Sequence, residues 1–322
     1  MTAVQAPVEV KPTAAQKGGP VGPRTHRALS MIPTWILWAI VVLWTIPTIG
    51  LLVNSFRPAK EQFTSGWWNV FTDPSFTLEN YRRALLDPPG GYIPFWQALL
   101  NSFAIAIPGT VIPILMAAAA AYAFAWIPFK GRSWLFIAVV GLLAIPLQMA
   151  LVPLLQFYTN GAHLTLFDHT VTLFPSLNLN GKPAAVWLTH AAFGLPLAIF
   201  LLHNYIAALP GEVFEAARID GADHFAIFWR IVLPLTTPAL AAFAIFQFLW
   251  VWNDYLIALI FLSGNNEASP LTVQLVNLVT GRGAGTELLP AAAFIAMVVP
   301  LIIFFSLQRF FVRGLLAGSV KG

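Results

Sequence analysis

The chain has 322 residues, of which 58% are hydrophobic and only 9% are charged, and its mean hydropathy is +0.75. A soluble domain carries roughly a quarter charged residues, so this composition excludes an ordinary soluble protein and indicates one that resides in a lipid bilayer. The net charge is +4, and the basic residues are spread over several loops, which gives no support for nucleic-acid binding. Because the chain has no cysteine, disulfides and thiolate metal sites are excluded as well.

The first 30 residues are rich in Pro, Ala, Gly and basic residues, and we expect them to form a disordered tail. No small-residue cleavage site follows the first apolar run, so we expect no cleaved signal peptide. Six uncharged runs follow, and each is long enough for the roughly 20 residues that cross a bilayer as a helix. They cover residues 31–53, 92–129, 133–167, 183–211, 231–253 and 288–308. The sequence therefore predicts an all-α membrane protein with six transmembrane helices.

The distribution of basic residues predicts the orientation of these helices. With the N-terminus inside, 11 of the 17 Lys and Arg residues fall in inner segments, and four of the other six lie in one long outer loop. The positive-inside rule then favours cytoplasmic N- and C-termini. We expect a cytoplasmic tail at 1–30, a first span at 31–53, an extracytoplasmic loop at 54–94, a five-helix core at 95–312 and a cytoplasmic tail at 313–322.

Two outer loops carry local patterns. Residues 76–81 have the pattern of a short amphipathic helix at the membrane interface, close to the tryptophans Trp67 and Trp68. Residues 263–287 contain four glycines, which indicate turns.

The inner loop at 209–234 is a polar stretch between two apolar runs. Glu215 lies near the positive end of a predicted helix, and Ala216 and Ala217 are small enough to let a partner approach its backbone. Phe214 could anchor this helix in an apolar groove of a partner. Gly221 can adopt a positive φ and reverse the chain before a second short helix. An amphipathic connector on lipid headgroups is the alternative, against which the acids of the first turn argue.

This loop carries a resemblance to a known family. Glu215-Ala216-Ala217, Gly221 and Ile231-x-Leu233-Pro234 match the EAA loop of binding-protein-dependent ABC importer permeases at every position and spacing. Other segments resemble the carbohydrate group of this family, and in particular its subunits like the second, smaller-loop maltose permease. They are Leu78-Glu79-Asn80-Tyr81, Asn101-Ser102, Ala120-Ala121-Tyr122-Ala123-Phe124, Trp250-Val251-Trp252-Asn253-Asp254 and the C-terminal segment from Arg313 to Gly322.

The resemblance implies the fold of an ABC type I importer permease in a bacterial or archaeal cytoplasmic membrane. It also implies three kinds of partner: a sister permease, two copies of an ATPase subunit, and an extracytoplasmic sugar-binding protein. The loop would be a coupling helix seated in the ATPase, where Glu215 would pair with a basic residue. The C-terminal residues Ser319, Lys321 and Gly322 would reach the same partner.

The chain itself lacks a nucleotide-binding motif. It contains no Gly-x4-Gly-Lys-Ser/Thr sequence, so ATP and Mg would be bound by the partner ATPase, and we expect neither cofactor nor enzymatic activity in this chain.

Asp254 directly follows the run at 231–253 and is the one formal charge in the apolar stretch between Arg230 and Glu267. With Trp252 and Asn253 it could line a sugar path, since sugars stack on aromatic rings and bond to amides and carboxylates. The alternative is a structural acid near the interface, satisfied by a neighbouring group. Elsewhere, His163 and His169 flank Asp168 in an outer loop, but without Cys or a Glu-x-x-His helix a solvated loop is favoured over a metal site.

The resemblance implies the permease subunit of an ATP-driven importer for a sugar or oligosaccharide, and it favours α-glucosides such as maltose, maltodextrin or trehalose. An ion-coupled secondary carrier is the alternative, although only Asp254 offers an intramembrane carboxylate. A membrane enzyme or an assembly factor is a third possibility, for which no catalytic constellation can be named.

Overall fold

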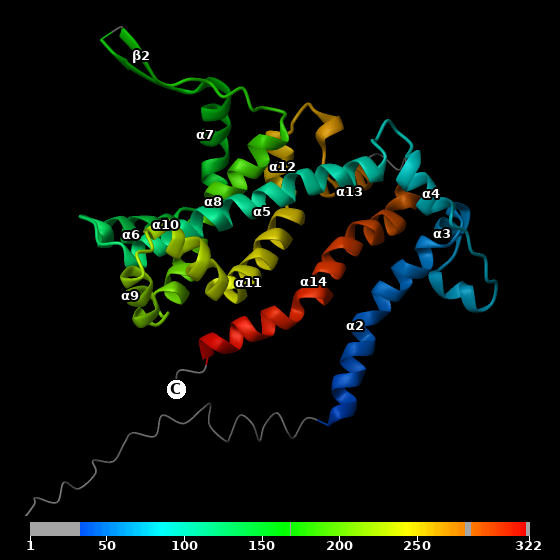
Figure 1. The fold of residues 1–322 in the computed structure, drawn as a ribbon. Coiled ribbons are helices and arrows are strands. Elements are labelled where there is room, and N and C mark those ends of the chain that lie inside the picture. Colours follow the sequence, from blue (N-terminus) through cyan, green and yellow to red (C-terminus); the bar gives the residue numbers. More distant parts are fainter. Residues whose placement is uncertain (1–32, 168, 281–284, 320–322) are drawn as a thin grey trace, which may run out of the picture. The chain divides into compact units, whose positions relative to one another are not determined.

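The structure is a computed structural model that describes residues 33–167, 169–280 and 285–319 (Figure 1). The chain divides into a compact unit of residues 50–318 and a smaller unit that includes residues 33–49. The smaller unit contains most of helix α2, Thr34–Ser55, whose side chains up to Ile49 are almost all exposed. Exposed apolar side chains along a helix of 22 residues are typical of a span surrounded by lipid.

Long helices form the body of the larger unit. They are α5 (Phe95–Trp126), α6 (Arg132–Gly141), α7 (Leu147–Asn160), α8 (Pro183–Ile206), α11 (Leu233–Trp252) and α14 (Leu289–Ser319). Shorter helices connect them. They are α3 (Ala59–Thr64), η1 (Trp67–Phe71), α4 (Glu79–Leu86), η2 (Leu142–Ala144), α9 (Gly211–Ile219), α10 (His224–Ile227), η3 (Phe228–Val232), α12 (Leu256–Phe261), η4 (Asn266–Ala268), α13 (Leu271–Thr280) and η5 (Thr286–Leu288).

Within the described residues, five helices are long and apolar enough to cross a membrane. A sixth crossing results if Arg132–Ala144 and Leu147–Asn160 are one span, although these two pieces meet at an angle of 104°. The bend falls at Ile145 and Pro146, which are both extended. A residue before proline avoids the helical region, so the break follows from the local sequence. With the bent pair counted as one span, the predicted six spans are confirmed.

The third apolar run ends differently from its prediction. Residues 162–167 were expected to belong to a span or its loop, but Ala162–Leu166 (β1) and His169–Phe174 (β2) form an antiparallel hairpin. On one face His163 contacts Thr172, and Thr165 contacts Thr170, through side-chain hydrogen bonds. The fold is therefore helical with one added hairpin, which projects from the end of α7 (Figure 1).

The core of the larger unit lies where α5, α8 and α11 pack together. The contact between α5 and α8 is close because Ala117, Ala118 and Ala121 are fully buried. A polar clamp joins all three helices: the buried Gln247 amide of α11 donates to Gly109 O of α5 at 3.1 Å. On α8, a side chain at Gly194 would place its Cβ 2.7 Å from Gln247 Oε1, so this contact requires glycine.

The loop at 54–94 is a folded substructure. Arg57, only 2% exposed, donates to the carbonyl oxygens of Glu61 and Ser65, and Asn80 donates to those of Ser55 and Arg57. The helix expected near residues 76–81 is present as α4, which begins at Glu79. At its exposed first turn, the hydrogen bond from Arg82 lowers the pKa of Glu79.

The loop at 263–287 contains a helix in addition to the turns that its glycines indicated. Residues 271–280 form α13, which buries Leu271, Gln274 and Leu278. The loop is fixed to the start of α5, where Asn101 Nδ2 donates to Glu267 O at 2.7 Å and Ser102 Oγ accepts from Leu271 N at 2.9 Å. The turns expected at the glycines are present at Gly264 and Gly285, which have a positive φ, and α13 forms between them, where the spacing of the buried residues is that of a helix face.

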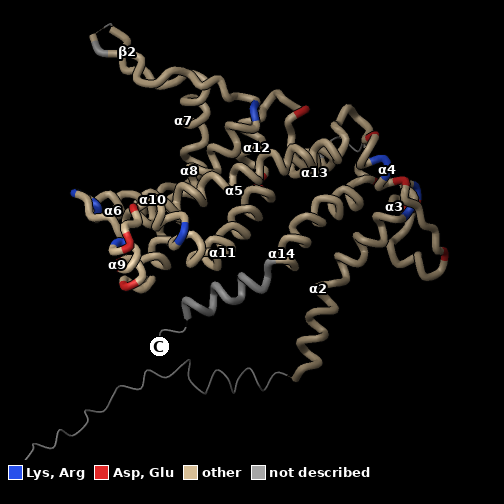
Figure 2. The backbone as a smooth tube through the Cα atoms, viewed as in Figure 1, with Lys and Arg blue, Asp and Glu red and all other residues tan. Residues whose placement is uncertain are grey.

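Charged residues of the larger unit gather at the ends of its helices. Figure 2 shows them near α6 and α9 and near α3 and α4, with the lengths of α5, α8 and α11 between them almost free of charge. This separation agrees with helices that cross an apolar layer between two aqueous phases.

Candidate functional site

The loop between α8 and α11 reverses the chain at Gly221. Helix α9 ends there with Gly221 at φ = 82°, and Ala222 N donates to Ala217 O at 2.9 Å. A left-handed glycine with such a bond is a common helix ending. Asp223 Oδ1 then accepts from Ala226 N at 2.7 Å and begins α10. The positive φ predicted for Gly221 is confirmed.

The span after this loop begins earlier than predicted. Residues His224–Trp252 form one continuous helix, whereas the apolar run suggested a start at residue 231. Its π-helical turn η3, Phe228–Val232, comes directly before Pro234. Because proline cannot donate to the carbonyl four residues earlier, a wider turn at this place accommodates it without ending the helix.

Phe214 anchors α9 to another helix of the same chain and not to a partner. It is 1% exposed and stacks on Trp126 of α5, with ring centroids 4.1 Å apart. Trp126 Nε1 in turn donates to Ile206 O at the end of α8. The prediction that Phe214 inserts into a partner was wrong, because the end of α5 supplies the aromatic groove. Sequence reasoning missed Trp126, although Tyr122 and Trp126 lie four residues apart on one helix face.

Several other side chains of the loop are exposed, whereas Ile227 and Val232 are buried. Glu215 and Ala216 are exposed, and Ala217 is half-buried. Ile219 of the same helix is 86% exposed, and Phe225 of α10 is 71% exposed. We call the exposed residues Val213, Glu215, Ala216, Ile219, Phe225 and Trp229 the loop face. Exposed apolar residues beside an acid form the kind of surface that binds another protein or rests on lipid headgroups, which are the two interpretations that the sequence offered for this loop.

The three residues predicted to line a sugar path are not brought together in one cavity. Trp252 is buried between Phe103 and Phe248, with ring centroids 4.9 Å and 5.5 Å away, so its role as a sugar contact is contradicted. Asn253 is exposed, and its amide donates to Leu249 O at 2.7 Å. Asp254 turns inward instead. Its Oδ2 accepts from Ala258 N at 3.1 Å in the first turn of α12.

Asp254 has a second neighbour across the core. His190 Nε2 of α8 lies 3.5 Å from Asp254 Oδ2, and His190 is completely buried. Neither nitrogen of His190 has a hydrogen-bond partner of good geometry among the described residues. The contact places a carboxylate against an imidazole at the junction of α8 with the α11–α12 corner, which is the structural role considered for this acid.

We predict that Asp254→Ala lowers the stability of the protein by about 1 kcal/mol, since it removes the acceptor at the start of α12. Asp254→Asn keeps an acceptor oxygen and should behave nearly as the wild type. The thermal unfolding midpoint in detergent measures the first effect, and the KM for sugar uptake provides the control. A large rise of KM in Asp254→Asn at normal stability would restore the sugar-path interpretation.

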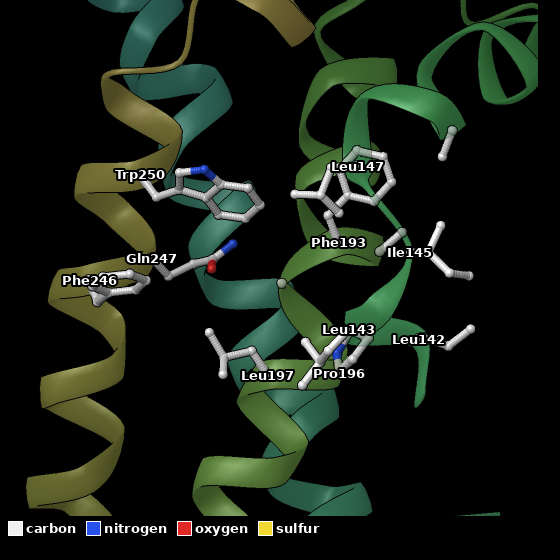
Figure 3. Close-up of a pocket in the computed structure, with 13 residues that line it drawn as sticks. Leu142, Leu143, Ile145, Leu147, Phe193, Pro196, Leu197, Phe246, Gln247 and Trp250 are labelled. Carbon is white, nitrogen blue, oxygen red and sulfur yellow. The ribbon is translucent and has the colours of Figure 1, made fainter. Parts of the chain in front are cut away.

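A pocket of about 430 Å³ lies between α8, α11 and the bend before α7. Figure 3 shows Trp250 and Gln247 extending from α11 toward Phe193 and Leu197 of α8, with Leu143, Ile145 and Leu147 at the bend. The lining is mainly apolar, and the Gln247 amide nitrogen is engaged by Gly109 O. The pocket therefore lacks the set of free polar groups that a sugar site needs.

The residues predicted to form C-terminal contacts lie at or beyond the end of the described part of the chain. Ser319 is the last residue of α14, whereas Lys321 and Gly322 lie outside the described residues. The same holds for Asp168 of the rejected metal site. Among the described residues, no group of three His, Cys, Asp or Glu could hold a metal ion.

Comparison with known families identifies the class of this chain. Residues 109–316 match the family of the binding-protein-dependent transport system inner membrane component. The match covers more than half of the chain and includes the loop with Gly221. The chain belongs to this family. It is therefore a multi-pass protein of the cytoplasmic membrane and a permease subunit of an ABC sugar importer, the class to which its sugar-transporting relatives belong.

Two relatives and one structure define the similarity further. The osmoprotective compounds uptake permease GgtD of Synechocystis is 50% identical over 286 residues, which are 88% of this chain and 89% of that protein. The alpha-glucoside transport system permease AglG of Rhizobium meliloti is 54% identical over 276 residues, 84% of this chain and 68% of that protein. One chain of a bacterial ABC transporter involved in alginate import has a TM-score of 0.67 at 22% identity, with 90% of the permease and 99% of that chain covered. That structure supports the fold.

Proposed function

We propose that this permease imports an α-glucoside or a closely related small glucoside, such as maltose, trehalose or a maltodextrin. The carrying observation is the similarity to the alpha-glucoside permease AglG, which is 54% identical over 276 residues. A second relative at 50% identity takes up osmoprotective compounds, which agrees with a small neutral substrate.

The loop face is proposed as the seat of an ABC ATPase subunit. Three observations support this proposal: the exposed apolar side chains of the loop face, the exposed acid Glu215, and the match of the loop to the EAA pattern. In this proposal both termini are cytoplasmic, as the basic residues favour. The full importer contains a sister permease, two ATPase subunits that bind ATP and Mg, and an extracytoplasmic binding protein. Ser319, Lys321 and Gly322 are proposed to meet the ATPase as well.

The substrate is tested with the whole complex in proteoliposomes, supplied with its binding protein and with ATP on the ATPase side. We expect uptake of maltose or trehalose, and the same sugar should raise the melting temperature of the binding protein. Cellobiose is the matched control, because it differs from maltose only in the configuration of its glycosidic bond. Equal uptake of cellobiose would contradict the α-glucoside assignment. Uptake that follows the proton gradient at constant ATP would contradict the ABC mechanism.

A further inference from the structure

One side chain of α5 touches all three elements of the loop. Tyr122, 3% exposed, stacks on Phe214 of α9 with ring centroids 6.5 Å apart and lies 5.9 Å from the ring of Phe228 in η3. Its hydroxyl lies 2.9 Å from Nδ1 of His224, the first residue of α10. Tyr122 is therefore the point where α9, α10 and η3 meet the same long helix.

We propose that Tyr122 and His224 are positioning residues for coupling, in that their hydrogen bond makes α5 follow the loop when the ATPase moves it. The inference rests on the proposed coupling role of the loop and adds the route by which movement leaves it. It assigns a task to two residues outside the loop face.

The hydrogen bond adds a constraint that the ring contacts do not supply. Aromatic rings packed at 5 to 7 Å tolerate sliding and tilting, whereas a hydrogen bond weakens steeply when its angle changes. A displacement of α10 without α5 would also leave the nearly buried Tyr122 hydroxyl without a partner, which is unfavourable. The bond therefore favours joint movement of α10 and α5.

Helix α5 can carry the movement further because it packs closely against α8 and because hydrogen bonds attach its far end to another loop. Its fully buried alanines Ala117, Ala118 and Ala121 pack closely in the same cluster as Ala198 and Leu202 of α8. Near its start, Asn101 and Ser102 hold the backbone of residues 267–271 in an outer loop. The route thus runs from the loop through Tyr122 along α5 to the opposite end of the permease.

The test uses the complete complex with Tyr122→Phe, which removes the hydroxyl and keeps the ring packing. His224→Gln is the second variant, since it moves the polar group away from the Nδ1 position. His224→Asn is the matched control, because its amide can occupy the place of Nδ1. We expect all three to assemble with the ATPase subunits. Stimulation of ATP hydrolysis by the loaded binding protein should fall about five- to ten-fold in the first two and be retained in His224→Asn.

A distance measurement separates coupling from general stability. Because the chain has no cysteine, spin labels can be placed through Met116→Cys on α5 and Arg230→Cys in η3, both exposed positions. The label distance should stay constant between nucleotide-free and ATP-bound states of the otherwise wild-type complex, and change or broaden in Tyr122→Phe.

Normal stimulation in Tyr122→Phe and His224→Gln, with an unchanged label distance, would overturn the inference. If Gly221→Val lost stimulation in the same experiment, the coupling role of the loop would stand without this route. If Gly221→Val also kept it, the proposed coupling role itself would be wrong.

Discussion

Replacement of Gly221 by valine should abolish the ATP hydrolysis that the binding protein stimulates, while the permease still inserts into the membrane. The residue has φ = 82°, and a Cβ built there meets nothing within 4 Å. The cost is therefore backbone strain and not a collision. For a β-branched residue the left-handed region is strongly unfavourable, by at least roughly 1–2 kcal/mol. We expect the turn to relax and α10 to point away from its present direction, so that the loop face is no longer formed.

Gly221→Asn is the control for this experiment, because asparagine tolerates a positive φ far better than valine. It should retain most of the stimulated activity. The measurement is ATP hydrolysis by the reconstituted complex with and without loaded binding protein, together with sugar uptake. Normal uptake in the valine variant would show that the reversal at Gly221 is not needed for coupling.

Phe214→Ala should release α9 from the end of α5. Truncation of a buried phenylalanine costs about 3–5 kcal/mol, and Phe214 also loses its stack on Trp126 at 4.1 Å. A helix of 9 residues is not stable without such packing, so we expect local unfolding of α9. Trypsin should then cleave at Arg218, which is exposed in this helix, much faster than in the wild type.

Val213→Ala is the matched control for the phenylalanine, since Val213 is 38% exposed on the same helix and its truncation should leave the cleavage rate unchanged. Two readouts separate the internal role of Phe214 from a partner contact. Faster cleavage of the permease in the absence of ATPase subunits supports the internal role. Unchanged cleavage combined with loss of ATPase binding would restore the partner anchor that the sequence suggested.

Much of the fold could be predicted from apolar length. Six uncharged runs gave six crossings because a bilayer requires about 20 apolar residues of helix, whatever the tertiary contacts. The same criterion could not reveal the bend at Pro146 or the first strand of the hairpin, since both lie within the apolar run at 133–167. Another signal was available for the hairpin: polar and apolar residues alternate in His163-Leu164-Thr165-Leu166 and Thr170-Val171-Thr172-Leu173, which is the period of a strand.

The candidate site was predictable where it depends on backbone conformation and not where it depends on packing. Gly221 is informative by itself, because glycine favours the left-handed turn. The direction of Phe214 depends on which rings stand opposite it, and Tyr122 and Trp126 are about 90 residues away in sequence. Trp252 was misassigned for the same reason. An aromatic residue beside an acid suggests a sugar site, but the neighbouring helices had already enclosed the indole ring.

Helix α5 has contacts at both ends that are relevant to the energetics of the whole importer. With 32 residues it is roughly 48 Å long, more than the roughly 30 Å of a hydrocarbon layer. Near one end it holds the loop at 263–287 through Asn101, and near the other it holds the loop at 209–234 through Tyr122. If docking on the outside tightens ATP binding on the inside through this helix, ATP must tighten the outside docking by the same factor. This reciprocity follows from linkage and holds whichever element carries the effect, so a variant of α5 that weakens one effect must weaken the other equally.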